Sequence, residues 1–276
     1  PGFIGAIADN NEKQSYNILR KSNMLPEICA YVCPVEVQCE KGCIQRHFGN
    51  EPVQINLLQK YISKKARKEG WTSINIPSKS INKNIAVIGA GPSGLACAVK
   101  LLELGYKVTV FDREKNPGGL ITYTYPEYKI PTEAITGEIE FLLSKPKNDR
   151  LFWQLEKEIS IDYNLDHIFK NGFDAVYVAV GLTETVPLPN SKRPEKGVVD
   201  ALTFLRDAKF NTDMEIPPKV AVLGGGNSAV DAAVVSRRLG AEDVYLIYRR
   251  SFEETPAFPK ERDRALNEGV KLMILT

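Results

Sequence analysis

Four of the five cysteines lie within fifteen positions, at Cys29, Cys33, Cys39 and Cys43. Short, irregular spacing with a Cys-Pro step, here at Cys33, is typical of thiolates that hold iron–sulfur clusters. A disulfide framework fits short secreted chains better, and zinc sites usually have closer pairs than the gap between Cys33 and Cys39. The spacing therefore favours an iron–sulfur site, with zinc and disulfide as the alternatives. Cys97 stands apart in an apolar stretch and is predicted to be a core residue.

A glycine-rich turn, GAGPSG at 89–94, follows an apolar run at 85–88 and precedes a helical pattern at 95–104. In that context glycines let the backbone approach a pyrophosphate at a helix N-terminus. Asp112 follows Gly89 by 23 residues, where an acid can bind ribose hydroxyls. We predict a dinucleotide site here, and the alternative is the same turn without a ligand. The predicted contacts in the turn are Gly89, Ala90, Gly91, Pro92, Ser93 and Gly94.

A second turn, GGGNSA at 224–229, has the same placement after an apolar run at 219–223. Arg249 and Arg250 stand about where an NAD-binding turn has its acid, 25 and 26 residues after Gly224. Guanidinium groups there suit a 2′-phosphate, which favours NADPH over NADH. The alternative is a pair of arginines on an ordinary surface turn. The predicted contacts in the turn are Gly224, Gly225, Gly226, Asn227 and Ser228, with Ala229 in the place of the third glycine.

Two dinucleotide motifs 135 residues apart imply two cofactors that exchange electrons, with FAD first and NADPH second. A flavin disulfide reductase would need a cysteine pair shortly after the first motif, and the stretch NPGGLITY at 116–123 has none. The electrons therefore leave by another route, for which the cysteines at 29–43 are the candidate.

Composition and charge argue against a nucleic-acid-binding, a membrane-spanning or a secreted protein. The chain has 276 residues, of which 43% are hydrophobic and 25% charged, and its net charge of +2 gives no electrostatic case for nucleic acid. No apolar run approaches the ~20 residues of a membrane helix, and no signal peptide is evident. Clustered free thiols predict a reducing, cytoplasmic location. Because the first residue is proline, we expect residues before it in the full protein.

The pattern of elements predicts three parts. Residues 1–79 are expected to be helical, with a capped helix at 11–21, a helix that begins at Pro52 and ends before Gly70, and a linker at 76–84. Strands are expected at 85–88, 107–111, 175–180, 219–223, 244–248 and 270–275, with helices at 95–104, 200–208 and 229–239. Thr255-Pro256 is expected to open a last helix, and 186–197 to form a loop. The predicted fold class is α/β: a small α-helical iron–sulfur domain (1–79), an FAD-binding Rossmann-type domain (80–215) and an NADPH-binding one (216–276), truncated at both ends.

Six stretches together are similar to one family, the small subunit of glutamate synthase and the amino-terminal half of dihydropyrimidine dehydrogenase. They are CAYVCPVEVQCEKGC, VIGAGPSGLACA, FDREKNPGGL, YPEYKIP, VLGGGNSAVDAA and YRRSFEETPAF. The resemblance implies an FAD- and NAD(P)H-dependent iron–sulfur oxidoreductase that feeds electrons to a catalytic partner. The residues that match the family's FAD contacts are Gly89, Gly91, Ser93, Gly94, Asp112, Gly119 and Leu120. Those that match its NADPH contacts are Gly224, Gly226, Asn227, Ser228, Arg249 and Arg250.

The resemblance also implies roles for the cysteines, in two [4Fe–4S] clusters shared with an upstream cysteine block. Cys33 and Cys39 would ligate one cluster and Cys43 the other, while Cys29 matches the block without being a ligand. Gln59, sixteen residues after Cys43, takes the place of the fourth ligand. That residue is Gln in proteins like dihydropyrimidine dehydrogenase and typically Glu in the glutamate synthase branch. This chain departs from the family at 144–155, and it lacks the upstream cysteines and the carboxy-terminal part of the FAD domain.

We therefore expect an electron-input flavoprotein, most like the NAD(P)H-oxidising part of dihydropyrimidine dehydrogenase, within a hetero-oligomer. Its partner is expected to be the catalytic subunit or domain that receives electrons, with no nucleic acid and no membrane span. The alternatives are the small subunit of a glutamate synthase (NADPH) and, from a different class, a non-catalytic scaffold built on dinucleotide folds.

Overall fold

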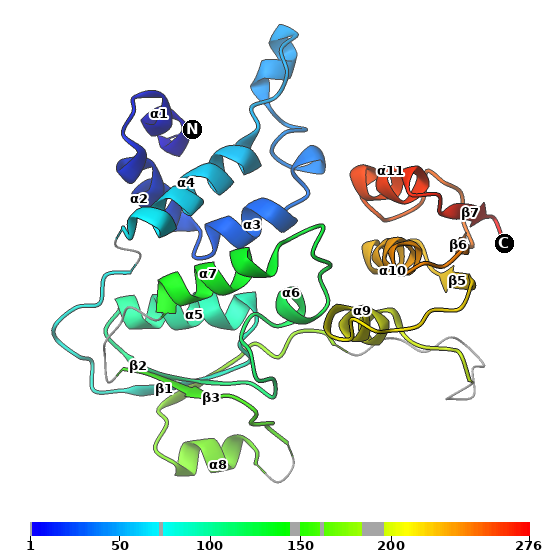
Figure 1. The fold of residues 1–276 in the computed structure, drawn as a ribbon. Coiled ribbons are helices and arrows are strands. Elements are labelled where there is room, and N and C mark those ends of the chain that lie inside the picture. Colours follow the sequence, from blue (N-terminus) through cyan, green and yellow to red (C-terminus); the bar gives the residue numbers. More distant parts are fainter. Residues whose placement is uncertain (1, 72–73, 144–149, 161–162, 184–195) are drawn as a thin grey trace. The chain divides into compact units, whose positions relative to one another are not determined.

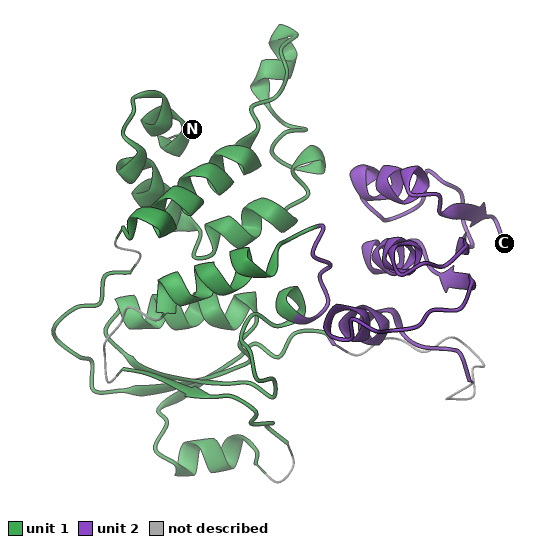
Figure 2. Cartoon of the chain, in the orientation of Figure 1, with its two compact units in different colours: residues 1–122, 129–182 green, residues 123–128, 183–276 purple. Residues whose placement is uncertain are grey.

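The computed structural model describes residues 2–71, 74–143, 150–160, 163–183 and 196–276. They form two compact units, residues 1–122 with 129–182 and residues 123–128 with 183–276 (Figure 2). The first unit holds both the helical N-terminal segment and the first sheet. The expected domain boundaries at 79 and 215 stay predictions.

The N-terminal segment is helical, as expected. Its elements are α1 (Gly2–Ala8), α2 (Glu12–Ser22), α3 (Pro26–Val32), the 3-10 helices η1 (Val35–Val37) and η2 (Ile44–Phe48), and α4 (Ile55–Glu69). The Asn11 side chain accepts a hydrogen bond from the Gln14 N–H and so caps α2, and left-handed Gly70 ends α4. The prediction that a helix starts at Pro52 is wrong, because the Ile55 N–H bonds to the Val53 carbonyl in a tight turn and α4 begins only there.

The first sheet is parallel, with strand order β3-β2-β1-β4 (Figure 1). Its strands are β1 (Asn84–Ile88), β2 (Lys107–Phe111), β3 (Leu151–Gln154) and β4 (Ala175–Val178). Helices α5 (Pro92–Glu103) and α7 (Thr132–Leu143) lie on one side of this sheet and α8 (Leu165–Lys170) on the other. The short helix α6 (Leu120–Tyr123) lies between β2 and α7 in the sequence. The chain reverses its winding at β1, which pairs with β2 on one side and β4 on the other. Such a switch point is where doubly wound folds bind ligands.

The second unit has a three-stranded parallel sheet, β5-β6-β7. Its elements are α9 (Ala201–Phe210), β5 (Lys219–Leu223), α10 (Asn227–Arg238), β6 (Asp243–Tyr248), α11 (Pro259–Asn267) and β7 (Lys271–Ile274). Val230, Val234 and Val244 lie at the centre of its core. Residues 123–128 also belong to this unit, where the Tyr128 hydroxyl donates to Asp231 Oδ1 at 2.8 Å.

Most expected strands and helices are confirmed to within two residues, but the last helix is not. It begins at Pro259 and not at Thr255-Pro256, because Asn227 Oδ1 accepts from the Phe258 N–H and the Ala257 N–H donates to the Gly225 carbonyl. These bonds hold the preceding loop onto the second glycine turn. The atypical stretch at 144–155 forms strand β3 in its described part, while 144–149 and most of the expected 186–197 loop lie outside the described residues.

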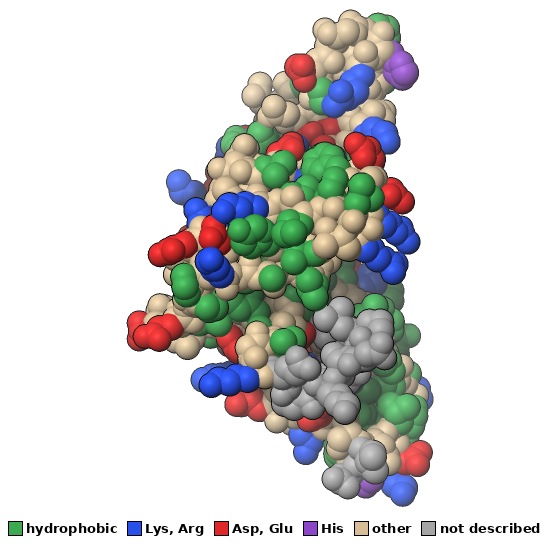
Figure 3. Space-filling view, turned by 90° about the vertical axis from the view of Figure 1, so that its right-hand side faces the viewer, with side chains coloured by type: hydrophobic (Ala, Val, Ile, Leu, Met, Phe, Trp, Pro, Cys, Tyr) green, Lys and Arg blue, Asp and Glu red, His purple; other side chains and the backbone are tan. Residues whose placement is uncertain are grey.

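Among the residues that the structure describes, no helix is both long enough and apolar enough to cross a membrane. On the face shown in Figure 3, Lys and Arg side chains lie beside Asp and Glu side chains, so the described residues of that face form no continuous basic surface.

Candidate cofactor-binding sites

The first glycine turn follows β1 and depends on close backbone approach. Gly89 has a φ of +106°, and its N–H donates to the Phe111 carbonyl at 2.7 Å. A Cβ on Gly89 would overlap the Ala179 carbonyl oxygen, and one on Gly94 would overlap the Gly89 carbonyl oxygen. The protein itself therefore requires glycine at both positions.

Gly91 is different, because nothing among the residues that the structure describes requires a glycine there. Its φ of −72° and ψ of 179° suit any residue, and a Cβ would have no neighbour closer than the Gly119 Cα at 4.0 Å. The open space lies at the N-terminus of α5, where Gly91 is the N-cap. A glycine that keeps this space free fits the pyrophosphate of a dinucleotide.

The second predicted FAD segment, which contains Gly119 and Leu120, lies beside this turn. The Gly118 N–H donates to the Ala90 carbonyl at 2.7 Å, and a Cβ on Gly119 would lie 2.9 Å from the Gly91 Cα. Leu120, the next residue, begins α6. The structure thus brings both predicted FAD segments together.

Asp112 lies directly after β2, at the same edge. Its Oδ2 accepts from the Ala90 N–H at 2.6 Å and its Oδ1 from the Glu114 N–H at 2.8 Å. Each oxygen keeps a second lone pair that can accept from a ribose hydroxyl. Ser93 Oγ lies 3.0 Å from the Tyr177 hydroxyl on β4. Sequence reasoning missed Tyr177, since the apolar pattern of β4 gives no sign that this residue reaches the turn.

The second glycine turn has the same construction. Gly224 has a φ of +135°, and a Cβ on Gly225 would lie 2.7 Å from the Tyr248 ring. Gly226, the N-cap of α10, has a φ of −86° and open space around its Cβ position. As at Gly91, a glycine that keeps this space free fits a bound pyrophosphate. Tyr248 was not predicted from the sequence, although its place at the end of β6 is a usable signal.

Arg249 and Arg250 are exposed and follow β6, whose Ile247 pairs with Leu223 just before the second turn. Both guanidinium groups are therefore carried at the edge where the turn lies. The N–H and hydroxyl of Ser251, and next the Arg250 charge, lower the pKa of the nearby Glu254 carboxyl. Of the other predicted contacts, Ser228 is exposed in the first turn of α10, while the Asn227 side chain accepts from the Phe258 N–H. Asn227 therefore has a structural partner of its own.

The cysteine segment follows α3. Cys29 lies within α3, Cys33 is its C-cap, Cys39 is exposed, and Cys43 precedes η2. All five cysteines are free thiols, and Cys97 is only half-buried in α5. Burial and then the nearby Cys39 raise the pKa of Cys33, whose Sγ lies 3.4 Å from Gln38 Oε1. Free thiols at this spacing fit cluster ligation by their donor chemistry.

The predicted cysteine ligands are two for one cluster and one for the other, and in the part of the chain that the structure describes they form no set of three. Within the described ranges, no three side chains of His, Cys, Asp or Glu lie close enough together to hold a metal ion. Beyond the effect of burial, Cys39 lies near enough to Cys33 to raise the pKa of that thiol. Gln59 is half-buried on α4.

Comparison with known proteins finds two family models, one for each part of the chain. Residues 83–274 match the family model described as pyridine nucleotide-disulphide oxidoreductase. Residues 1–71 match the model described as dihydropyrimidine dehydrogenase domain II, 4Fe-4S cluster.

Curated relatives align over almost the whole chain. The glutamate synthase [NADPH] small chain of Escherichia coli is 35% identical, over 98% of this chain and 58% of the relative. The NADPH-Fe(3+) oxidoreductase subunit beta of Geobacter sulfurreducens is 33% identical, over 98% of this chain and 40% of the relative. The NAD-dependent dihydropyrimidine dehydrogenase subunit PreT of Escherichia coli is 31% identical, over 99% and 65%. The chain thus spans less than two thirds of the length of each.

Solved structures share the fold at low identity. FprA of Mycobacterium tuberculosis, in complex with NADPH, aligns with a TM-score of 0.57 and 19% identity over 68% of this chain and 48% of that chain. A 2-naphthoyl-CoA reductase complex aligns with a TM-score of 0.55 and 18% identity over 86% of this chain and 34% of that chain.

The matches confirm the expected resemblance, the α/β fold class and the cofactor set of FAD, NAD(P)H and a [4Fe–4S] cluster. Because the first family model matches well over half of the residues, the chain belongs to the pyridine nucleotide-disulphide oxidoreductase family of pyridine-nucleotide-dependent oxidoreductases.

Proposed function

We propose that this chain is the electron-input part of a larger oxidoreductase. It takes hydride from NADPH to FAD and passes single electrons through [4Fe–4S] clusters to a catalytic partner. One observation carries this proposal: the two turns have the same construction, and each has a middle glycine, Gly91 or Gly226, that the protein itself does not need. Two such cradles in one chain suit two dinucleotides that exchange electrons.

Bound flavin accepts a two-electron hydride and can release single electrons. The residues of this chain would bind and orient the two cofactors. Gly91 and the N-terminus of α5 would take the FAD pyrophosphate, and Asp112 the ribose. Gly119 and Leu120 would complete the same site. Because β1 and β2 are parallel neighbours, Asp112 and the glycine turn lie at one edge of the sheet, at the switch point where a dinucleotide would bind.

Gly226 and the N-terminus of α10 would take the pyrophosphate of the nicotinamide nucleotide. Arg249 and Arg250 would bind its 2′-phosphate through charge-assisted hydrogen bonds, which supports NADPH. Of the three relatives described above, two carry NADPH in their names and one is NAD-dependent. The arginine pair is the feature of this chain that favours the phosphorylated cofactor.

The cysteine segment would carry the clusters, with Cys33 and Cys39 on one and Cys43 on another. Gln59 would supply one further ligand and an upstream cysteine block the others, and Gln59 supports the finer assignment to an enzyme like dihydropyrimidine dehydrogenase. A glutamate synthase is the second candidate, favoured by the relative at 35% identity. Several relatives are named as subunits or chains, which supports a hetero-oligomer with a separate electron acceptor.

Anaerobic purification of the full-length protein tests the proposal. Flavin absorption bands, a broad cluster shoulder, bound iron and bleaching by NADPH are the expected results. A colourless protein would support a non-catalytic scaffold instead, and zinc or a Cys33–Cys39 disulfide without iron would refute the cluster. Co-purification with the neighbouring subunit, followed by assays of NADPH-dependent pyrimidine reduction and of glutamate formation, distinguishes the two candidate enzymes.

A further inference from the structure

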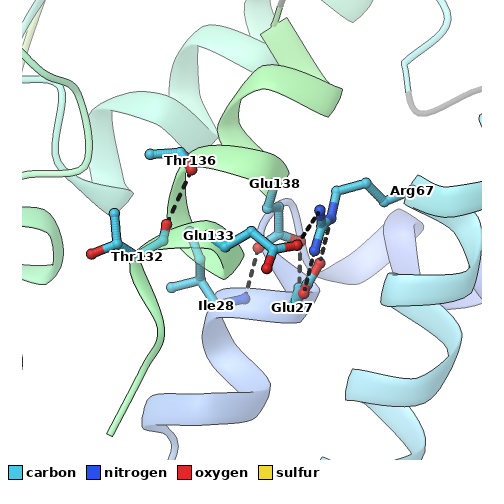
Figure 4. A network of polar contacts seen from close by, with 7 residues as sticks. All are labelled: Glu27, Ile28, Arg67, Thr132, Glu133, Thr136 and Glu138. Atoms are coloured by element: carbon cyan, nitrogen blue, oxygen red, sulfur yellow. Dashed lines mark hydrogen bonds and ion pairs between the residues drawn. The ribbon is translucent and has the colours of Figure 1, made fainter. Parts of the chain in front are cut away.

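Helix α7 carries a buried carboxyl group, that of Glu138, which belongs to neither candidate cofactor site. Glu138 is only 3% exposed in an otherwise apolar helix face. Its Oε1 accepts from the Glu27 N–H at 2.8 Å and its Oε2 from the Ile28 N–H at 2.7 Å (Figure 4). A buried carboxyl group is costly unless such bonds compensate for its lost hydration.

Those two N–H groups lie in the first turn of α3. The N-cap of α3, Leu25, offers no side-chain oxygen, so Glu138 supplies the missing cap from a helix about 110 residues further along the chain. Burial raises the pKa of Glu138 to about 8, and the two N–H donors act in the opposite direction. Glu138 thus joins α3 directly to α7.

A second contact ties α4 to the same place. The Glu27 side chain is 1% exposed and pairs with Arg67 through two bonds, Nε to Oε2 at 3.2 Å and Nη2 to Oε1 at 3.1 Å. Arg67 Nη1 also lies 3.5 Å from Glu133 Oε1 on α7. Such a bidentate pair fixes orientation as well as distance.

Gly137 on α7 makes room for this guanidinium. A Cβ at Gly137 would lie 2.6 Å from Arg67 Nη1 and 2.8 Å from its Cζ. The guanidinium therefore lies against the α7 backbone where a side chain is missing. This observation is independent of the hydrogen bonds and points to the same close fit.

The three joined helices carry different parts of the proposed electron path. Helix α3 contains Cys29 and ends at the C-cap Cys33, and α4 carries Gln59. Helix α7 lies against the FAD loop, since a Cβ on Gly118 would be 3.4 Å from the Ile139 side chain. The contacts therefore lie between the cysteine segment and the flavin-binding loop, all within the first unit.

We propose that Glu138, Glu27 and Arg67, together with the space at Gly137, position the cysteine segment against the flavin-binding loop and so set how fast electrons pass from flavin to cluster. The proposal rests on the proposed function above. Its physical basis is that electron tunnelling weakens steeply with distance, so a small shift of α3 would slow transfer without affecting the nicotinamide site. Glu138 is thus a positioning residue.

The test compares five full-length variants with wild type. Gly137→Ala places a methyl group where the guanidinium lies and leaves every charge intact. Glu138→Gln replaces one accepting oxygen by a donor facing an N–H. The control, Thr136→Ala, changes an exposed neighbour whose hydroxyl bonds only within α7, to the Thr132 carbonyl. Arg67→Ala alone and the Arg67→Ala, Gly137→Ala double variant complete a double-mutant cycle with Gly137→Ala.

Four measurements are made on each protein: bound iron, the rate of flavin reduction by NADPH, the subsequent rate of cluster reduction, and amide exchange at Glu27 and Ile28 in cofactor-free protein. Gly137→Ala and Glu138→Gln should keep iron and flavin reduction, but slow cluster reduction by about tenfold or more. Glu138→Gln should also speed exchange by about tenfold at the amide that faces the new NH₂ group, since that amide loses its acceptor. Thr136→Ala should match wild type, and Gly137→Ala should add nothing once Arg67 is absent.

An unchanged rate of cluster reduction in both variants would overturn the proposal and leave the contacts a purely stabilising role. Unchanged amide exchange in Glu138→Gln would overturn the capping contact itself. Wild-type protein without iron would instead refute the proposed function and the electron-transfer role with it. The exchange measurement needs no cofactor, so the two failures are distinguishable.

Discussion

Replacing Gly91 by valine should weaken FAD binding strongly and change the stability of the flavin-free protein only slightly. The backbone at Gly91 is extended, and a Cβ there would meet no atom nearer than 4.0 Å. An aliphatic residue in place of glycine at an N-cap costs about 1 kcal/mol or less. We therefore expect the melting temperature of flavin-free protein to fall by only about 2–4 °C.

The effect on FAD should be much larger. The valine side chain would occupy the space at the N-terminus of α5 and displace the pyrophosphate from its N–H donors. Hydrogen bonds to charged groups contribute about 1.5–3 kcal/mol each, so losing one or two costs about 2–6 kcal/mol. The Kd for FAD should then rise by about 30-fold to 10⁴-fold, measured by fluorescence titration of the flavin-free protein.

Gly94→Ala is the matched control. Its Cβ would overlap the Gly89 carbonyl oxygen, so the turn itself must distort. This variant should lose thermal stability together with FAD, whereas Gly91→Val should lose FAD alone. Gly91→Val protein that purifies with its full yellow colour would refute the assignment of the first turn to FAD.

Three further predictions follow from the other sites. Replacing Arg249 and Arg250 by alanine should weaken NADPH binding by about 1–3 kcal/mol more than NADH binding, and equal losses by titration would show that they do not bind the 2′-phosphate. Cys39→Ala in the full-length protein should lower iron content and end electron delivery, while NADPH-dependent dye reduction at the flavin persists; Gln59→Ala should have a milder effect, and unchanged iron in Cys39→Ala would contradict the cluster assignment. Because burial raises the pKa of Glu138 to about 8 from 4.5, its contribution to stability is lost as pH rises through that interval, by up to about 1.4 kcal/mol per unit. Denaturant unfolding at a series of pH values should show this slope in wild type and not in Glu138→Gln, and equal slopes would contradict it.

Local signals predicted the two glycine-rich turns, each between a strand and a helix. Gly89 and Gly224 need positive φ, and each lies between a short apolar strand and a helix. Both requirements act within a few residues, so the spacing in the sequence is enough to identify them. The acid and the arginine pair that follow could also be found, because β2 and β6 have lengths that bring their ends to the turns.

Contacts between distant segments changed the expected elements. Thr255-Pro256 has the pattern of a helix start, yet the Asn227 side chain binds the Phe258 N–H and delays the helix to Pro259. The atypical stretch around Leu151 gave no strand signal, and it forms β3 because the edge of β2 is available to pair with it.

The sequence by itself was enough to locate the cysteine segment and the two glycine-rich turns, to predict the order of strands and helices around them, and to indicate the family. These depend on periodicity and spacing over short stretches of chain. Only the tertiary structure showed that Gly91 and Gly226 are glycines the protein does not need, and that Glu138 caps α3 while Arg67 lies over Gly137. Those facts depend on which atoms approach one another from segments tens to more than a hundred residues apart. A single sequence has no local pattern that encodes such distances, because they are set by how the helices pack on the folded sheet.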